Sequence, residues 1–259
     1  MTETLSAIVA DLAAPGHLLA FCDETDLTRE ATSTMVADIH LHAAVVLPSD
    51  GYGALAASLA AALETFGAAE FHAKDIVNKG KSIWRDRDKA QRLAALRTIC
   101  DALCQSGAHI YHVHIARAQY HEIAATVPPG VLDADYKAGV KTRFRELVAA
   151  LLDTPVPAIV VADKERDTAG LGLAKFDGGD HLLGGGIILA HSHDIGGLQL
   201  ADAAAYVVGR YLRRRDRMIA VGDEADLDDF DRLVAETVGR LNGRLHSLLS
   251  ELLLHCEAA

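Results

Sequence analysis

The stretch LLAFCDET, from Leu18 to Thr25, is a short apolar run that ends directly in acidic residues. A run of this length and composition is typical of a buried strand. A second stretch of the same kind, AIVVAD, spans Ala158 to Asp163 and again ends in an acid. The segments around these two runs alternate between strand-like and helix-like patterns. We therefore predict an α/β protein in which helices cover a sheet.

The remaining elements follow from periodicity and from Gly and Pro breaks. Further strands are predicted at Met35–Leu47, Ala108–Ile115 and Ile187–His193, and helices at Tyr52–Phe66, Asp86–Cys104, Val131–Leu152, Leu198–Arg214 and Asp223 to about Cys256. Ala69–Ile76 is expected to be extended or irregular, and the Gly-rich Gly170–Gly186 to be a loop in which LLGGGI forms a flexible hairpin. No helix separates the first two strands, so part of the sheet should be antiparallel.

The bulk composition limits the classes of function. Half of the 259 residues are hydrophobic and the formal net charge is −11. A general DNA-coating protein is usually basic, because its affinity comes from neutralising phosphates. An acidic enzyme that holds divalent cations is compatible with this charge, since carboxylates are ligands for Mg²⁺. The residues up to Leu19 do not resemble a signal peptide, and no apolar run approaches the roughly 20 residues of a membrane helix, so we predict a cytoplasmic protein.

The acids that end the two apolar runs are the main candidates for chemistry. Ligand sites of α/β sheets lie at strand ends, so Asp23 and Asp163 are expected to face one cleft. Carboxylates at such a distance repel each other unless a cation lies between them, and Mg²⁺ or Mn²⁺ is the natural choice. Asp202 lies in the apolar GGLQLADAAAY segment and shares a helix face with Gln199 and Tyr206. The alternative for Asp23 and Asp163 is a solvated turn residue or a helix cap, and for Asp202 it is a polar contact within the helix turn.

The segments FCDETD, EFHAKD, VVADK and SHDIGGLQLADAAAY together resemble the bacterial family known as domain of unknown function 3800. The resemblance runs from about Leu18 to Tyr211. It implies a ribonuclease H-like fold, a mixed sheet flanked by helices, and two-metal cleavage of a phosphodiester. Carried over by position, it implies that Asp23, Glu24, Asp163 and Asp202 hold the metals. One departure is Asp26, which stands where the family usually has glycine.

Several other residues are candidates for supporting roles. Glu70 and His72 point to the same side of an extended segment and are expected to add a ligand and a proton carrier. Lys74, Lys79, Lys81, Arg85 and Gln199 are expected to contact the substrate, and Trp84 to stack on a base or else to lie on a solvated helix face. Three HxH pairs, His40/His42, His112/His114 and His191/His193, suit a metal if they are not surface pairs; the last pair is best placed, and His193 is an alternative proton carrier.

These observations favour a metal-dependent nuclease or phosphodiesterase that uses Mg²⁺ or Mn²⁺ and acts on nucleic acid. Two alternatives remain open: a zinc-type hydrolase of small esters or amides that uses the HxH pairs, and a non-catalytic partner-binding module with the same fold. We predict a ribonuclease H-like domain over residues 1–217 and a C-terminal helical extension over residues 218–259. The leucine-rich extension would pack on the domain or form a homodimer.

Overall fold

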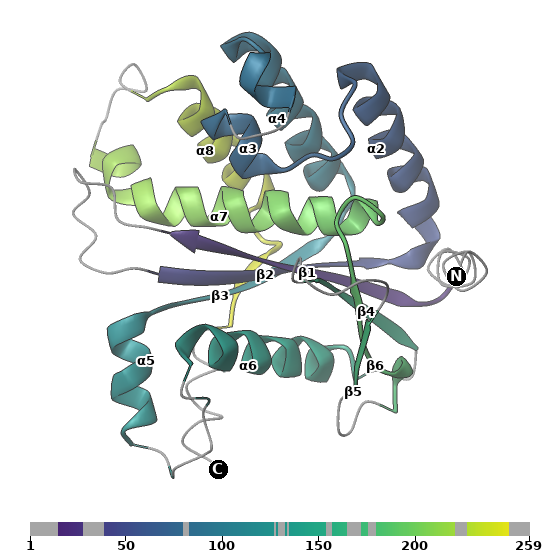
Figure 1. Cartoon of the computed structure of the whole chain (residues 1–259), viewed down its shortest axis with the longest axis vertical. Helices are drawn as coiled ribbons and strands as arrows, with labels where there is room; N and C mark the ends of the chain where they lie inside the picture. The colour runs from purple at the N-terminus through teal and green to yellow at the C-terminus, as the bar shows by residue number, and fades with distance from the viewer. Residues whose placement is uncertain are drawn as a thin grey trace.

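The structure is a computed structural model, and it describes residues 15–27, 39–79, 83–126, 128, 133, 135–153, 157–164, 172–175, 180–220 and 227–248. Seven strands form one sheet in the order β5-β6-β4-β1-β2-β3-β7. Helices α2, α3, α4, α7 and α8 lie on one side of the sheet, and α5 and α6 lie on the other (Figure 1). The predicted fold class, a mixed α/β sheet flanked by helices, is confirmed.

The elements have the following bounds. The strands are β1 Leu18–Leu27, β2 Ile39–Pro48, β3 His109–Ala116, β4 Ala158–Asp163, β5 Gly172–Lys175, β6 Leu182–Ala190 and β7 Leu245–Ser247. The helices are α2 Tyr52–Phe66, α3 Ala73–Asn78, α4 Lys89–Gln105, α5 Arg117–Ala124, α6 Tyr136–Leu151, α7 Gly196–Ala220 and α8 Asp229–Leu241, with short 3-10 turns at Ser49–Gly51 and Ile83–Asp86. None of the described helices is long and apolar enough to cross a membrane.

The two predicted buried strands, β1 and β4, are neighbours in the middle of the sheet. They run parallel, and their ladder pairs Leu18 with Ala158 and ends with Cys22 beside Ala162. The next residue of each strand is the acid, so Asp23 and Asp163 follow the same rung. On its other side β1 pairs with β2 in antiparallel fashion, which confirms the prediction from the missing helix between them.

Side chains of β1 alternate between two hydrophobic cores, as the two-residue period of a strand requires. Leu19 and Phe21 belong to the core beneath α7, whereas Ala20 and Cys22 belong to the core covered by α6. The same alternation must continue at the end of the strand. It therefore sends Asp23 and Glu24 to opposite faces of the sheet.

Helix α7 crosses the sheet and fixes the C-terminal part of the described chain. Its Arg210 is buried and donates a hydrogen bond of 2.7 Å to Asp231 of α8, and a second one to the Tyr206 hydroxyl. A buried arginine needs such partners to offset its loss of hydration. Arg210 thus belongs to the contact between α7 and α8.

Three predicted elements differ from the structure. Helix α3 begins within the segment expected to be irregular, and the LLGGGI segment is part of strand β6, which pairs with β5. The helix predicted to run to about Cys256 ends at Leu241, and β7 then joins the sheet beside β3; residues 249–259 lie outside the described part of the chain. Strands β6 and β7 are stabilised by pairing with partners that are distant in the sequence, and a local sequence pattern does not reveal such pairing. The proposed boundary after residue 217 falls within α7; the two-domain division and the homodimer stay predictions.

The buried histidine His112 predicts how acid affects the fold. Burial, together with His114 and His246, lowers the pKa of its ring to about 4. In the unfolded chain the ring takes up a proton near pH 6.5. The neutral His112 ring therefore makes its full contribution to the stability of the fold above pH 6.5. This contribution is lost as the pH falls toward 4.

We expect His112→Gln to reduce the loss of unfolding free energy between pH 7 and pH 4.5 by on the order of 2 kcal/mol. Urea unfolding at both pH values measures this difference. His121→Gln, which changes an exposed histidine of α5, is the matched control and should leave the pH dependence unchanged. Equal pH dependence of wild type and His112→Gln would show that His112 has no such role.

Candidate functional site

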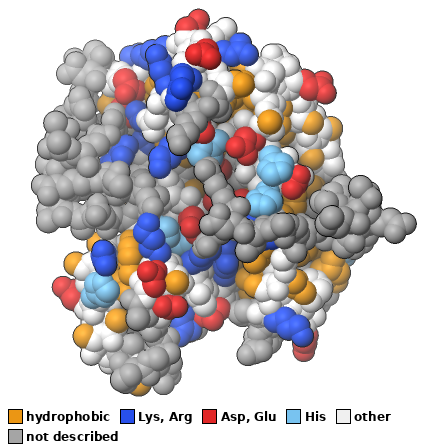
Figure 2. Space-filling model, viewed as in Figure 1, with side chains coloured by type: hydrophobic (Ala, Val, Ile, Leu, Met, Phe, Trp, Pro, Cys, Tyr) orange, Lys and Arg blue, Asp and Glu red, His pale blue; other side chains and the backbone are white. Residues whose placement is uncertain are grey.

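The three predicted aspartates line one cavity, although they come from distant parts of the chain. Asp23 follows the last residue of β1 that pairs with β4, Asp163 ends β4, and Asp202 comes from α7 above them. The cavity measures about 480 Å³. Its lining residues are Asp23, Glu24, Glu70, Phe71, His72, Asp163, Lys164, His191, Ser192, His193 and Asp202. On the face shown in Figure 2, acidic, histidine and basic side chains gather near the middle.

The segment before α3 is fastened to α7 by side chains of the QLAD stretch. The Ala73 N–H donates to Asp202 Oδ2 at 2.7 Å, and the Phe71 N–H donates to Gln199 Oε1 at 3.0 Å. The amide nitrogen of Gln199 donates to the carbonyl of Ser192 at 3.1 Å. Gln199 does not line the cavity, and both ends of its buried amide bind backbone groups. Its amide therefore holds the segment before α3 in position, and its predicted contact with the substrate stays a prediction.

Glu70 and His72 reach the cavity from this segment, as predicted. Glu70 accepts a hydrogen bond of 3.0 Å from the Ser192 hydroxyl. The His72 ring lies between two carboxylates, with Nδ1 3.2 Å from Asp75 and Nε2 3.5 Å from Asp202. An imidazole in this position can take up a proton from the cavity and return it.

The electrostatics of the aspartates are those of crowded and poorly hydrated carboxylates. Burial raises the pKa of Asp202 to about 6, against the opposing effect of His72 and of the hydrogen bond from Ala73. Burial, followed by the charges of Asp202 and Asp163, raises the pKa of Asp23 well above its ordinary value. Burial also raises the pKa of Asp163. Groups that are this costly to ionise occur mostly at functional sites.

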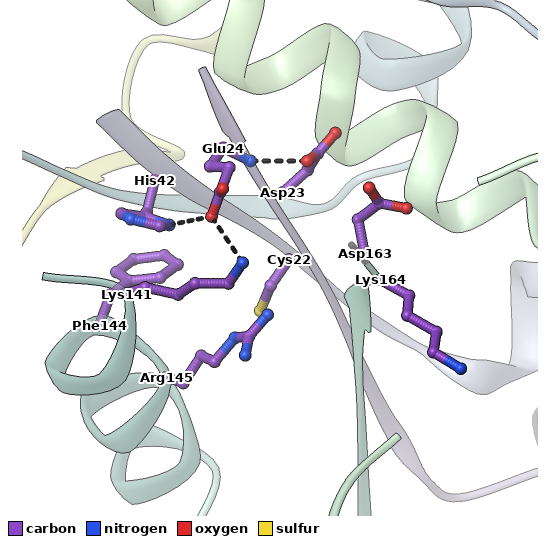
Figure 3. Close-up of a pocket in the computed structure, with 9 residues that line it drawn as sticks. All are labelled: Cys22, Asp23, Glu24, His42, Lys141, Phe144, Arg145, Asp163 and Lys164. Atoms are coloured by element: carbon purple, nitrogen blue, oxygen red, sulfur yellow. Dashed lines mark hydrogen bonds and ion pairs between the residues drawn. The ribbon is translucent and has the colours of Figure 1, made fainter. Parts of the chain in front are cut away.

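Glu24 has a different place from the one predicted for it. Its carboxylate turns toward α6, where Oε2 lies 3.2 Å from Lys141 Nζ and 3.5 Å from His42 Nδ1 (Figure 3). The carboxylates of Asp23 and Asp163 are drawn on the opposite side, toward α7. Glu24 borders the acidic cavity, but the strand alternation directs its charge away from the three aspartates. A role beside Asp23 as a metal ligand is a prediction that this orientation does not favour.

A second, smaller cavity of about 260 Å³ adjoins the first. Lys141 and Arg145 enter it from α6, where their spacing of four places them on one helix face. Lys164, the residue after Asp163, also lines it and is buried. The two cavities share Asp23, Glu24, Asp163 and Lys164. Cationic side chains therefore lie beside the acidic cluster.

The predicted basic contacts are located elsewhere. Lys74, Lys79 and Arg85 are exposed, and none of them lines either cavity. Lys81 lies outside the described residues. Both readings of Trp84 are wrong, because its side chain is 1% exposed and stacks on Phe71 in the core.

The three HxH pairs lie in three different environments. The rings of His191 and His193 stack at 5.4 Å and line the acidic cavity, as expected for the best-placed pair. The rings of His112 and His114 stack at 5.7 Å on β3. His40 and His42 are buried on β2 and adjoin Glu24.

Two kinds of metal site are thus suggested by the donor atoms. Among the described residues, one group of three His, Cys, Asp or Glu side chains has its donor atoms within 4.8 Å of one another, namely Glu24, His40 and His42. The three aspartates are spaced more widely than that. They still fit Mg²⁺, because this ion prefers carboxylate oxygens, retains several waters and needs only one or two protein carboxylates. A divalent cation would also offset the burial and the mutual repulsion that raise their pKa values.

No family model matches the chain, and none of the curated proteins matches it. Membership of the family that the sequence resembles therefore stays a prediction. A solved structure, a mutant of Bst-RNase HIII, aligns with 93% of this chain and 67% of its own, at 14% identity and a TM-score of 0.37. A similarity of this degree transfers no function to the chain.

Proposed function

We propose that the protein is a metal-dependent phosphodiesterase that cleaves nucleic acid in the acidic cavity. The observation that carries the proposal is the convergence of Asp23, Asp163 and Asp202, from two strands and a helix, in one cavity that raises the pKa of all three carboxylates. A fold gains no stability from such crowding, since each charge opposes the others. The arrangement is explained if the carboxylates serve a cation and its substrate.

Asp23, Asp163 and Asp202 would hold Mg²⁺ or Mn²⁺. When bound, such ions stabilise the negative charge that develops on a phosphodiester and activate water as the nucleophile. Glu70 and His72 line the same cavity. His72 is in place to pass a proton between Asp202 and the substrate, at the atom Nε2. Gln199 keeps the Glu70–His72 segment in position through its bond to Phe71.

The cations of the neighbouring cavity complete the proposed substrate site. A chain with a net charge of −11 must bind a polyanion through a local positive patch. Lys141, Arg145 and Lys164 provide one directly beside the acids. Arginine suits phosphate in particular, because its planar guanidinium binds two oxygens at once. These three residues take the role predicted for the exposed basic segment.

We expect Arg145→Met to raise KM for a nucleic-acid substrate about tenfold and to change kcat much less, because a phosphate contact outside the reacting centre binds substrate and transition state alike. Steady-state kinetics at fixed ionic strength measures both constants. Lys74→Met, which removes an exposed cation outside both cavities, is the matched control and should leave KM unchanged. A KM in Arg145→Met equal to that of the wild type would refute the role of Arg145.

The test of the proposed activity is hydrolysis of single- and double-stranded DNA and RNA and of their hybrid, with Mg²⁺, with Mn²⁺ and with a chelator. We expect at least one substrate to be cleaved only with metal, and Asp163→Asn to be inactive. Retained folding of the variant is checked by circular dichroism. Absence of metal-dependent cleavage on every substrate, or equal activity of Asp163→Asn, would overturn the proposal.

The zinc-hydrolase alternative is favoured by one observation, the close grouping of Glu24, His40 and His42. The group lies on the α6 side of the sheet, away from the aspartates. Hydrolysis of small esters that persists in Asp163→Asn and is lost in His42→Gln would favour this alternative. The partner-binding module would be favoured if neither kind of substrate were turned over.

A further inference from the structure

We propose that Glu24, His40 and His42 form a second metal site, selective for Zn²⁺-like ions, on the sheet face opposite the three aspartates. The antiparallel ladder sets Glu24 directly across from His42, and His40 lies two residues along the same strand. All three side chains therefore point to one face. Their donor atoms lie within 4.8 Å of one another. The backbone register alone thus brings three potential ligands together.

The two imidazoles are unusual for a hydrophobic interior. His40 and His42 are 2% and 3% exposed, and their rings meet edge to face at 4.5 Å. His42 stacks on Phe144 at 5.6 Å, and His40 meets the edge of Tyr136 at 5.9 Å. Aromatic walls of this kind fix the planes of both rings. A ligand pair is thereby held in place before any ion arrives.

The hydrogen bonding of His42 is incomplete. Its Nε2 atom is buried and has no hydrogen-bond partner among the described residues. The ring is therefore not fixed by a hydrogen bond at Nε2. The other nitrogen, Nδ1, faces Glu24 Oε2 at 3.5 Å, which is long for a hydrogen bond. Glu24 therefore holds Nδ1 only weakly, and this nitrogen is available to an ion that Glu24 also binds.

The separation of these two atoms suits coordination. Bonds of 2.0–2.1 Å to a tetrahedral ion place neighbouring ligands about 3.4 Å apart. The distance of 3.5 Å between His42 Nδ1 and Glu24 Oε2 is close to that value. Two histidines and one carboxylate leave a fourth position for water. The adjoining cavity, which Glu24 and His42 both line, is a route by which an ion and its water can enter.

Lys141 is the natural competitor of the ion. Its ammonium group lies 3.2 Å from Glu24 Oε2, and its side chain is 16% exposed. The Lys141 ammonium and the Arg145 guanidinium line the same cavity, and both positive charges repel an entering metal ion. Binding must break the Lys141–Glu24 ion pair and release the ammonium into the cavity. This exchange predicts that loss of the lysine charge strengthens metal binding.

Ligand chemistry separates this site from the acidic cavity. Imidazole nitrogen suits Zn²⁺, Co²⁺ and Ni²⁺, whereas Mg²⁺ prefers oxygen ligands. The end of β1 would therefore hold hard ions on one face through Asp23 and borderline ions on the other face through Glu24. The inference does not depend on the proposed nuclease activity, because its evidence is the second group of side chains.

The experiment is a Co²⁺ titration of the full chain, with excess Mg²⁺ present to occupy the aspartates, followed by visible absorption. We expect one equivalent of Co²⁺ with a tetrahedral spectrum, displaced by Zn²⁺. Glu24→Gln should weaken binding about 100-fold or more, since even outer partners of metal ligands are worth about 10- to 100-fold. Lys141→Met should strengthen it about tenfold, as the loss of one competing ion pair implies.

Two control variants locate the bound ion. Asp202→Asn and His193→Asn change the acidic cavity and should keep the spectrum and the affinity. The inference is overturned if neither wild type nor Lys141→Met shows the spectrum, or if the spectrum survives in Glu24→Gln and is lost in Asp202→Asn or His193→Asn. Circular dichroism identifies a variant that fails to fold, and Lys141→Met then provides the deciding result.

Discussion

Asp202→Asn is expected to abolish the metal-dependent activity and, at the same time, to stabilise the metal-free protein. The activity should fall at least about 1,000-fold, because loss of a metal ligand removes several kcal/mol of transition-state stabilisation. The substitution is nearly isosteric, and asparagine can still accept the hydrogen bond that the Ala73 N–H donates. The loss would therefore reflect the missing charge and not a broken segment.

The gain in stability follows from the raised pKa of Asp202. In the unfolded chain this carboxyl loses its proton near pH 3.8, whereas in the folded chain it does so at about pH 6. The protonated carboxyl thus makes its full contribution to stability below pH 3.8. This contribution is lost as the pH rises through about 6. At pH 7 without metal, Asp202→Asn should be more stable by about 2 kcal/mol, and its stability should change less between pH 4 and pH 6.5.

Urea unfolding in a chelator and kinetics with Mg²⁺ or Mn²⁺ together check this pair of effects. Glu122→Gln, which changes an exposed acid of α5, is the control and should alter neither quantity. A variant that loses activity because it is less stable than the wild type would contradict the account. A substitution that raises the stability and lowers the activity is expected only where the fold tolerates strain for the sake of function.

Gly197→Ala is expected to destabilise the fold by about 3 kcal/mol. Gly197 opens α7 directly above Phe21, and an added Cβ would lie 2.5 Å from three atoms of that ring. The ring has no room to withdraw, since Phe21 is fully buried and stacks on Tyr52 at 5.1 Å. The Tyr52 hydroxyl in turn accepts a hydrogen bond from the Gly197 N–H. The clash must therefore move α7, and with it Asp202.

The neighbouring glycine provides a matched control. A Cβ on Gly196 would meet Leu59 Cδ1 at 3.4 Å, an ordinary contact with a flexible side chain. Gly196→Ala should therefore change the unfolding free energy by less than about 0.5 kcal/mol. Urea unfolding of both variants at pH 7 gives the comparison. Equal stability of the two would show that the contact between α7 and β1 is looser than described.

The place of the aspartates was open to prediction because strand ends are visible in a sequence. The apolar runs before Asp23 and Asp163 mark two buried strands, and the parallel ladder between them stops just before both acids, although β1 itself continues to Leu27. Asp202 followed from its presence on an apolar helix. The residues that tertiary packing brings near the aspartates could not be predicted from the sequence. Lys141 and Arg145 lie on a helix whose position over this edge depends on long-range packing.

The differences between prediction and structure have equally specific causes. Glu24 was grouped with Asp23 by adjacency, although the two-residue period of a strand already sends neighbours to opposite faces. Trp84 was read as a surface residue because charges surround it, yet its ring fills the core. Strand β7 covers only three residues, and nothing short of its pairing with β3 would distinguish it from the end of a leucine-rich helix.

The proposed function requires that Asp23, Asp163 and Asp202 jointly bind divalent metal. Its most direct test is the thermal unfolding of the wild type and of Asp23→Asn, each at pH 7.5 with and without Mg²⁺. An ion that binds only the folded state raises the melting temperature, so we expect Mg²⁺ to stabilise the wild type and to leave Asp23→Asn unchanged. An equal response of the two proteins to Mg²⁺, or no response of the wild type, would contradict the claim.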